Sequence, residues 1–467
     1  MRHTNLLAAV VLIGAVFLIG QATQLSFLPN LFPFRNSSGF SATFTTNRVI
    51  DLTNPFFQSL GTNGRSCGTC HQPDQGWTVS AEEIQERFLA TRGLDPIFRT
   101  NDGSNCNHNI DTSTLAGRSS AYSLLTSRGL IRIAIDVPAN AEFEVAAVQN
   151  PYGCNETSTL SMYRRPLPAT NLRALSAVMW DGRESTSPST EKITFPTNPN
   201  DLLFDLAHQA VDATLGHAQA LTPPTPDQQQ GIVNFEMALS TAQIADNHAG
   251  LLNVLGATGG PFQLSQQNFF VGINDPLGGN PSGAPFTPVI FTLFQPWSNP
   301  DPYFPGTAAR AAIARGEDLF NSKTIHIIGV AGLNDDLGIG DIPGTCGTCH
   351  DTPNIGNHSL PVPLNIGVAD LTSPLDVSYL PVITLRNKVT KQTVQTTDPG
   401  RALITGNWKD IGKLKGPILR GLASRAPYFH NGSARTLSDV VDFYDARFNI
   451  GLTSQEKADF IAFLNAL

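Results

Sequence analysis

Six segments of the chain have apolar residues at the three- and four-residue spacing of an amphipathic helix. They are residues 80–93, 200–220, 226–248, 308–321, 436–448 and 452–467. Ser80, Thr436 and Thr453 stand at N-cap positions of three of these helices. Asp439 and Glu456 follow the two threonines at the spacing of a capping box. Apart from a hairpin expected around GLIRIAIDVP, the rest is irregular, so the pattern predicts an all-α fold with long loops and insertions.

The composition agrees with long loops, because 40 glycines and 33 prolines are present among 467 residues. A chain of this length can form roughly two to four domains. The net charge of −8 argues against nucleic acid as a partner, because phosphate binding requires clustered lysine and arginine.

The N-terminus has Arg2 followed by an uncharged apolar run from Leu6 to Ile19. This run is shorter than the roughly 20 residues of a membrane span and suits the apolar part of a secretory signal. With Gly20 and Ala22 as small residues after it, we predict a signal peptide over residues 1–22. The alternative is a retained anchor, and only then would the protein contact a membrane. We therefore expect a periplasmic protein in an oxidising compartment.

The sequence CGTCH occurs twice. C-x-x-C-H attaches c-type haem, since two thiols reach the two vinyl groups of one porphyrin and the next residue presents an imidazole to the iron. The predicted attachment residues are Cys67, Cys70, Cys346 and Cys349, and the predicted iron ligands are His71 and His350. Zinc is disfavoured because the two cysteine pairs lie far apart and each has its own histidine. A redox dithiol is disfavoured because neither motif has a βαβ context.

The remaining two cysteines are Cys106 and Cys154. In an oxidising compartment such a pair predicts a disulfide, and both lie in loop-like sequence. Two free thiols are the alternative.

The motifs divide the chain into two haem domains. A helix, a haem motif, a loop and two terminal helices over residues 305–467 have the layout of a small cytochrome c domain. Residues 40–256 form a longer N-terminal cytochrome c-like domain with insertions. Residues 257–304, rich in glycine and proline, are expected as an interdomain loop on the surface.

The second axial ligand decides whether a haem iron carries electrons or performs chemistry. Methionine is the usual ligand in cytochromes c, but no methionine follows Met237. The C-terminal domain therefore cannot ligate its own haem iron with methionine. Its candidates are a lysine, His358, His430, Tyr428 and Tyr444.

Three segments resemble one known family. KLKGPILRGLASRAPYFHNGSARTLSDVVDFY is similar to the C-terminal signature of the bacterial di-haem cytochrome c peroxidases and MauG-type enzymes. ATNLRALSAVMWDGRE resembles their inter-haem segment, and RGEDLF resembles the start of their second domain. The resemblance covers most of residues 50–467, with insertions.

The resemblance implies roles for several residues. Tyr444, fourteen positions after His430, would be the distal ligand of the C-terminal haem, and a buried core tyrosine is the alternative. Trp180 would pass electrons between the haems. Pro427, in a segment where Arg425 replaces the family's threonine, would give a backbone ligand to an interdomain calcium ion.

The family also places a glutamine and then a glutamate over the N-terminal haem. Gln209 matches the glutamine, but the NPxEM stretch that holds the glutamate is missing. His217, two helical turns after Gln209, is a candidate replacement as proton shuttle. It could instead ligate the iron or be an ordinary surface histidine. Asp212 and His108 are weaker candidates for the proton and ligand roles.

The expected function is thus a di-haem oxidoreductase with peroxide as oxidant at the N-terminal haem and electron transfer through the C-terminal haem. A small redox protein, a cytochrome c or cupredoxin, would donate electrons. One alternative is an electron-transfer cytochrome without turnover. Another is MauG-like oxidation of a partner protein or organic substrate, which Tyr444 would favour.

Overall fold

The computed structural model describes residues 26–175, 177–185, 199–269, 285–299, 301–350 and 363–467, with Asn274 and Gly283. The predicted signal peptide and His358 lie outside these residues. Among the described residues, no helix combines the length and the apolar character that crossing a bilayer requires.

Most of the predicted helices are confirmed. The longer ones are α2 (Ala81–Thr91), α5 (Pro199–Gly216), α6 (Pro226–Met237), α8 (Thr307–Ser322), α11 (Leu437–Phe448) and α12 (Ser454–Asn465). Ser80 caps α2, and Thr436 and Thr453 form the expected capping boxes. Shorter helices are α3 (Leu115–Ala121), α4 (Ser123–Arg128), α7 (Pro261–Ser265), α9 (Asn334–Leu337) and α10 (Ala402–Thr405).

The all-α prediction is wrong, because helices make up 32% and strands 18% of the structure. Three antiparallel pairs join β1 (Phe27–Pro29) to β4 (Val49–Asp51), β5 (Ile131–Asp136) to β7 (Thr159–Arg164), and β10 (Ile325–Ile328) to β11 (Asp341–Gly344). A three-stranded sheet has the order β13 (Thr393–Thr396), β12 (Val382–Asn387), β6 (Phe143–Gln149). A four-stranded sheet has the order β2 (Phe34–Asn36), β3 (Gly39–Thr45), β8 (Leu239–Asp246), β9 (Gly250–Leu251).

One predicted helix is wrong in its second half. The segment 226–248 is helical only to Met237, and the chain then continues as β8. This strand pairs with β3, and the hydroxyls of Thr43 and Thr241 form a hydrogen bond of 2.8 Å between the two strands. The partner strand lies about 200 residues away in sequence, so the local pattern gave no sign of it.

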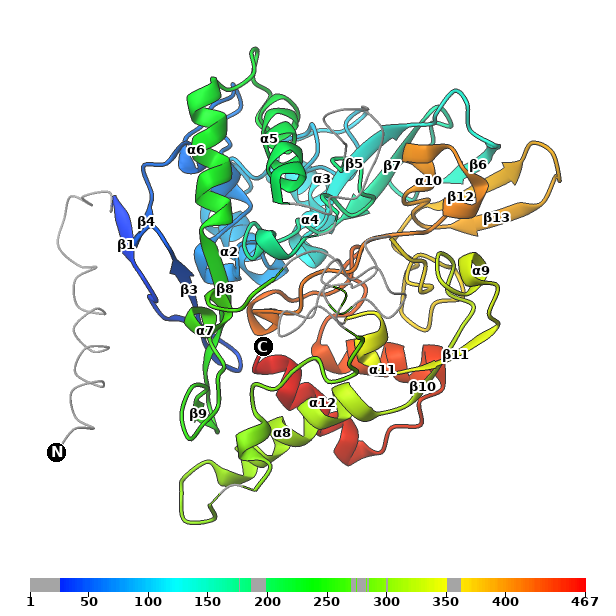
Figure 1. The fold of residues 1–467 in the computed structure, drawn as a ribbon. Helices are drawn as coiled ribbons and strands as arrows, with labels where there is room; N and C mark the ends of the chain where they lie inside the picture. Colours follow the sequence, from blue (N-terminus) through cyan, green and yellow to red (C-terminus); the bar gives the residue numbers. More distant parts are fainter. Residues whose placement is uncertain are drawn as a thin grey trace.

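The expected hairpin is also different. β5 is a strand, but it pairs with β7 and not with the next strand. The intervening β6 instead pairs with β12 from the C-terminal half, with a bulge between Thr384 and Leu385. Residues 143–149 and 382–387 thus form one sheet that joins the two halves of the chain (Figure 1).

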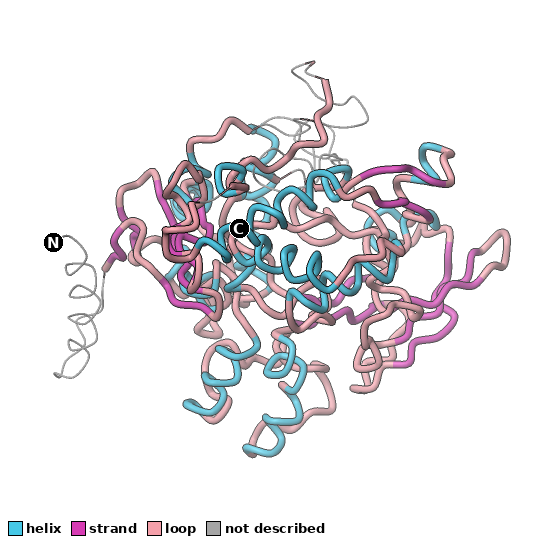
Figure 2. Tube along the Cα trace, turned by 90° about the horizontal axis from the view of Figure 1, so that it is seen from below, coloured by secondary structure: helices cyan, strands magenta, loops and turns pink. Residues whose placement is uncertain are grey.

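The helices of the C-terminal half surround a common core. α8 packs closely on α12, and a Cβ atom at Gly316 would lie 2.0 Å from the carbonyl oxygen of Asp459. Part of the segment expected as a surface loop enters this core: Phe291, Phe294 and Trp297 are buried there. Figure 1 shows helices α8, α11 and α12 together on one side of the molecule, and in Figure 2 several strands lie toward its margins.

We predict that Ile383→Ala, in β12, lowers the free energy of unfolding by about 2–5 kcal/mol. Ile383 is 0% exposed in the core between β6 and β12, so the truncation leaves a cavity where the two halves meet. Val389→Ala is the matched control, because Val389 is 87% exposed. Denaturant unfolding of both variants measures the difference, and equal stability would contradict the role of this sheet.

Candidate haem cavities

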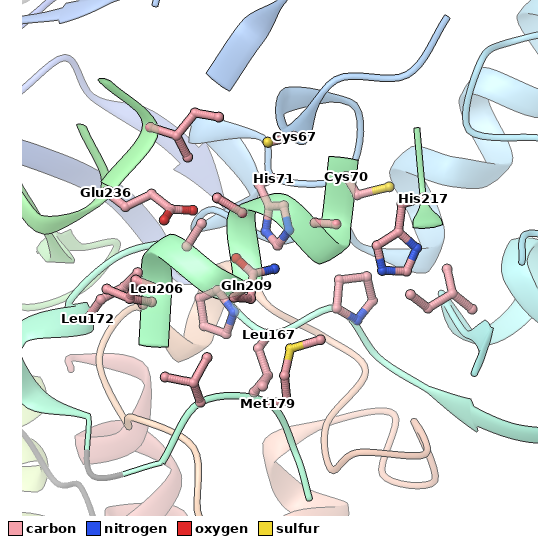
Figure 3. A pocket seen from close by; sticks show the side chains of 18 of the residues that line it. Cys67, Cys70, His71, Leu167, Leu172, Met179, Leu206, Gln209, His217 and Glu236 are labelled. Carbon is pink, nitrogen blue, oxygen red and sulfur yellow. The ribbon is translucent and has the colours of Figure 1, made fainter. Parts of the chain in front are cut away.

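The first CGTCH motif forms one wall of a cavity in the N-terminal half (Figure 3). Cys67–Thr69 make a short 3₁₀ turn closed by a capping box between Ser66 and Thr69. His71 follows and donates its Nδ1 hydrogen to the carbonyl of Trp77 at 3.0 Å, because a carbonyl only accepts. The Nε2 atom is thereby left as the ligand atom, as iron binding requires.

The second CGTCH motif forms the wall of another cavity in the C-terminal half. It has the same local turn, with a capping box between Thr345 and Thr348. Burial raises the pKa of Cys67 and of Cys346 to about 12, and raises that of Cys70.

The residues of each motif fit a covalently held haem. In both cavities, two thiols and an imidazole face a space lined mainly by apolar side chains. Cys67, Cys70, Cys346 and Cys349 form no disulfide. The predicted attachment residues therefore lie together at each motif as a porphyrin requires.

Helix α5 carries polar groups into the first cavity. Gln209 and His217 both line it, as their spacing on one helix face predicted. The Nδ1–H of His217 donates to Asp102 Oδ2 at 2.5 Å, and Asp102 also pairs with Arg65. Burial raises the pKa of Asp102, but the hydrogen bond from His217 and the charge of Arg65 lower it more, so the carboxyl stays ionised. His217 therefore lies at the cavity with its ring oriented by Asp102, and its side chain is 38% exposed.

The second cavity is almost entirely apolar. Tyr444, predicted as a ligand, lines it from α11, as do His430 and Tyr428. Burial raises the pKa of the Tyr444 phenol. The hydroxyl of Tyr428 already has a hydrogen-bond partner, since it donates to the carbonyl of Leu422 at 2.9 Å. Three of the candidate ligands thus surround one cavity.

Trp180 lies where the two cavities meet. It lines both cavities, together with Lys415 and Pro417. Its indole N–H donates to the carbonyl of Arg165 at 2.8 Å, and its ring lies 6.1 Å from that of His430. Lys415 is buried and donates to the carbonyl of Ala177 at 2.9 Å.

A buried charge network holds the turn after Trp180. Arg164 pairs with Asp181 and, through two hydrogen bonds of 2.7 and 2.8 Å, with Asp398 from the C-terminal half. Arg183 also pairs with Asp181 at 2.9 Å. Gly182, between them, has a φ of 73°, which glycine adopts without strain. Charge pairing of Asp181 with Arg164 and Arg183 thus holds this turn.

The surroundings of Pro427 do not fit calcium. The neighbouring Arg425 is buried, and its guanidinium donates to the carbonyls of Gly76 and Ile418. A second buried guanidinium, that of Arg165, donates to the carbonyls of Gly129 and Arg425. Two fixed positive charges thus already bind backbone oxygens of both halves, and they would repel a divalent cation.

Among the described residues, the other candidates line neither cavity. Cys106 and Cys154 form the predicted disulfide. His108 lies against its sulfur atoms and pairs with Glu156 at 3.2 Å, and does not line either cavity. Asp212 is exposed beside His208 and Glu184 and does not face the first cavity.

Three residues that line the first cavity were not predicted from the sequence: Asp102, Lys415 and Glu236. Glu236 ends α6 and lines the first cavity near Cys67 (Figure 3). Each lies in a loop or at a helix end, far in sequence from the motif it serves. Lys415 was part of the quoted C-terminal signature, which was the one signal that pointed to it.

Comparison with known proteins finds sequence relatives for part of the chain. It is 43% identical over 81 residues to "Cytochrome-c peroxidase IdrP1" of Pseudomonas sp. (strain SCT), covering 15% of this chain and 21% of that protein. It is 33% identical over 135 residues to "Cytochrome-c peroxidase IdrP2" of Denitromonas iodatirespirans, covering 27% and 36%. The chain therefore matches about a fifth to a third of the length of these relatives. No family model matches.

Two solved structures are similar at low level. A MauG-like protein associated with microbial copper homeostasis has a TM-score of 0.35 and 15% identity, with 96% of this chain and 95% of that chain covered. A variant of the diheme peroxidase BthA from Burkholderia thailandensis has a TM-score of 0.31 and 14% identity, with 95% and 94% covered. Similarity at this level transfers no residue roles.

We predict that Asp181→Asn lowers the free energy of unfolding at pH 7 by about 1.5–3 kcal/mol, the value of buried charged hydrogen bonds. The loss is not larger because Arg164 keeps Asp398 as a partner. Burial raises the pKa of Asp181, but Arg164 and Arg183 lower it to about 2. The carboxylate's contribution is therefore full above its usual pKa and is lost as the pH falls toward 2.

The difference in free energy of unfolding between wild type and Asp181→Asn should become smaller as the pH falls below about 4. Denaturant unfolding at pH 7 and pH 3 measures it. Asp136→Asn, at an exposed carboxylate, is the control. A difference that stays constant with pH would contradict the ionised role of Asp181.

Proposed function

We propose that the chain belongs to the superfamily of di-haem cytochrome c peroxidases and MauG-type enzymes, and that it is a periplasmic di-haem oxidoreductase that reduces hydrogen peroxide. The observation that carries the proposal is the asymmetry of two cavities that share Trp180. The first has an oriented histidine and a glutamine, whereas the second is nearly all apolar. Proton-dependent chemistry belongs in the first cavity, and electron transfer belongs in the second.

Each motif would hold its haem through both cysteines and the following histidine. His71 and His350 would be the proximal ligands. When bound, the haems supply iron that exchanges single electrons, and the first also activates the peroxide bond. The protein's own contribution is binding, orientation and proton transfer.

His217 is proposed as the base that accepts the peroxide proton. Because Asp102 accepts the Nδ1 hydrogen, the Nε2 atom of neutral His217 carries a lone pair. The ionised Asp102 then stabilises the imidazolium that forms, which favours proton uptake. Gln209, on the same face and two helical turns before His217, can donate its amide hydrogens to the oxygen atoms of the peroxide.

The second cavity suits storage and transfer of electrons. Tyr444 is proposed as the distal ligand of the haem at Cys346 and Cys349, because it lines that cavity and no methionine is present beyond Met237. Trp180 is proposed to pass electrons between the haems, because its side chain lines both cavities. A small redox protein, a cytochrome c or cupredoxin, would supply the electrons.

Two alternatives remain in the same framework. If His217 Nε2 binds the first iron, the protein is an electron carrier without turnover. If Tyr444 stabilises highly oxidised iron, a partner protein or organic molecule becomes the substrate, as in MauG-type enzymes. Calcium has no part in the proposal, because Arg165 and Arg425 occupy the expected surroundings of Pro427 with positive charge.

We predict that Asp102→Asn slows the reaction of the haem-loaded protein with hydrogen peroxide by about 100-fold, the lower range for loss of a proton-transfer group. Stopped-flow absorption of the haem bands measures the rate, and haem content and the visible spectrum check that the fold is kept. Asp111→Asn, at an exposed carboxylate, is the control. Wild-type protein with two low-spin irons that never reacts with peroxide, even when half-reduced, would reject peroxide reduction in favour of the carrier.

We predict that Trp180→Phe slows electron transfer between the haems and leaves the content of both haems unchanged. Phenylalanine keeps an apolar ring but loses the easily oxidised indole and its hydrogen bond to Arg165. Flash reduction followed by absorption measures the rate. Trp408→Phe is the control, since Trp408 lines neither cavity. An unchanged rate in Trp180→Phe would remove Trp180 from the transfer path.

A further inference from the structure

The first cavity contains a carboxyl group that the fold itself does not use. Glu236 is 6% exposed and lines the cavity from the end of α6. Within the described residues, its Oε2 atom has no hydrogen-bond partner. Figure 3 shows Glu236 at the opposite end of the cavity from His217, with His71 and Gln209 between them.

A structural role does not explain this side chain. The chain has another buried glutamate, Glu317, whose carboxylate accepts backbone hydrogens from Leu293 at 2.5 Å and Phe294 at 2.9 Å. Glu317 thereby fixes the segment before α8. No corresponding hydrogen bond to the Glu236 carboxyl is found among the described residues, so burying it costs stability without return. Such a cost is typical of functional sites.

The surroundings of Glu236 are apolar. Ile232, Phe56 and Phe235 belong to the adjoining core. Burial alone raises the pKa of Glu236 to about 8. The titratable or charged groups on the elements packed against it are Asp201, Asp205, His208 and Asp212 of α5, His217 directly after α5, Cys67 of the first motif, and Arg173 of the 3₁₀ turn Leu172–Ala174. Cys67 is the one among them whose own pKa responds to Glu236, and a thioether at Cys67 would carry no charge.

We propose that Glu236 binds a proton when the haem attached to Cys67 and Cys70 gains an electron. The inference rests on the proposed haem at the first motif, and it deepens the proposed function because peroxide reduction to two waters consumes two protons with two electrons. An added electron makes the cavity more negative, and in a low-dielectric site this favours the neutral carboxyl. One electron comes from the redox donor, one proton comes from solvent, and the O–H bond of the carboxyl is the only bond formed.

The test is the midpoint potential of the first haem as a function of pH, measured by visible absorption on the haem-loaded protein. In wild type, the potential should fall with rising pH by up to 59 mV per pH unit, the one-electron equivalent of a tenfold change per unit. The fall should lie on the alkaline side of neutrality. In Glu236→Gln, which keeps the side-chain shape but cannot bind a proton, the midpoint potential should not change with pH over this alkaline range. Glu144→Gln, at a half-exposed glutamate that does not line the cavity, should follow wild type.

A second measurement uses only the wild-type protein, so it does not depend on whether the Glu236→Gln variant folds. The reduced-minus-oxidised infrared difference spectrum of wild type should show a gain of the C=O band of a protonated carboxyl at alkaline pH. Equal pH dependence of the potential in wild type and Glu236→Gln, or no carboxyl band, would overturn the proposal. Neither measurement uses peroxide, so a protein that does not reduce peroxide can still satisfy the proposal about Glu236. Haem content, determined first, shows whether the shared premise holds.

Discussion

The guanidinium of Arg164 is the point on which the arrangement of both cavities depends. It is buried and pairs with Asp181, directly after Trp180, and with Asp398 in the other half of the chain. A buried cation needs such partners, because desolvation costs more than one carboxylate returns. The pairing therefore fixes the turn that carries Trp180 against residues more than 200 positions away. Together with the hydrogen bond from the Trp180 indole to the carbonyl of Arg165, it sets the position of the wall that the two cavities share.

The two cavities on either side of this wall differ in polarity. Helix α5 supplies the first cavity with amide and imidazole groups, and Asp102 sets which nitrogen of His217 bears hydrogen. Helix α11 supplies the second cavity with Tyr444 and aliphatic side chains. The same five-residue motif thus sits in two environments that differ in polarity, and this difference is what the proposed division between proton transfer and electron transfer rests on.

The local parts of this structure were accessible from sequence, and the long-range parts were not. The haem motifs, the caps of α2, α11 and α12, and the shared face of Gln209 and His217 depend on residues within two helical turns of each other. β8 and β6 take their identity from strands β3 and β12, which lie far away in the chain. Asp102 likewise gains its meaning only from contact with His217, 115 positions later. Tertiary pairing overrides local propensity in each of these cases.

The sheet between β6 and β12 has a consequence for how the protein is made. The partner of Phe143–Gln149 is synthesised more than 200 residues later, so this edge stays open while the chain emerges. Both CGTCH motifs precede β12 in the chain, so their thiols can meet an attachment enzyme before the sheet closes. The pairing of β6 with β12 thus makes the joining of the two halves a late event, because it needs residues from the last fifth of the polypeptide.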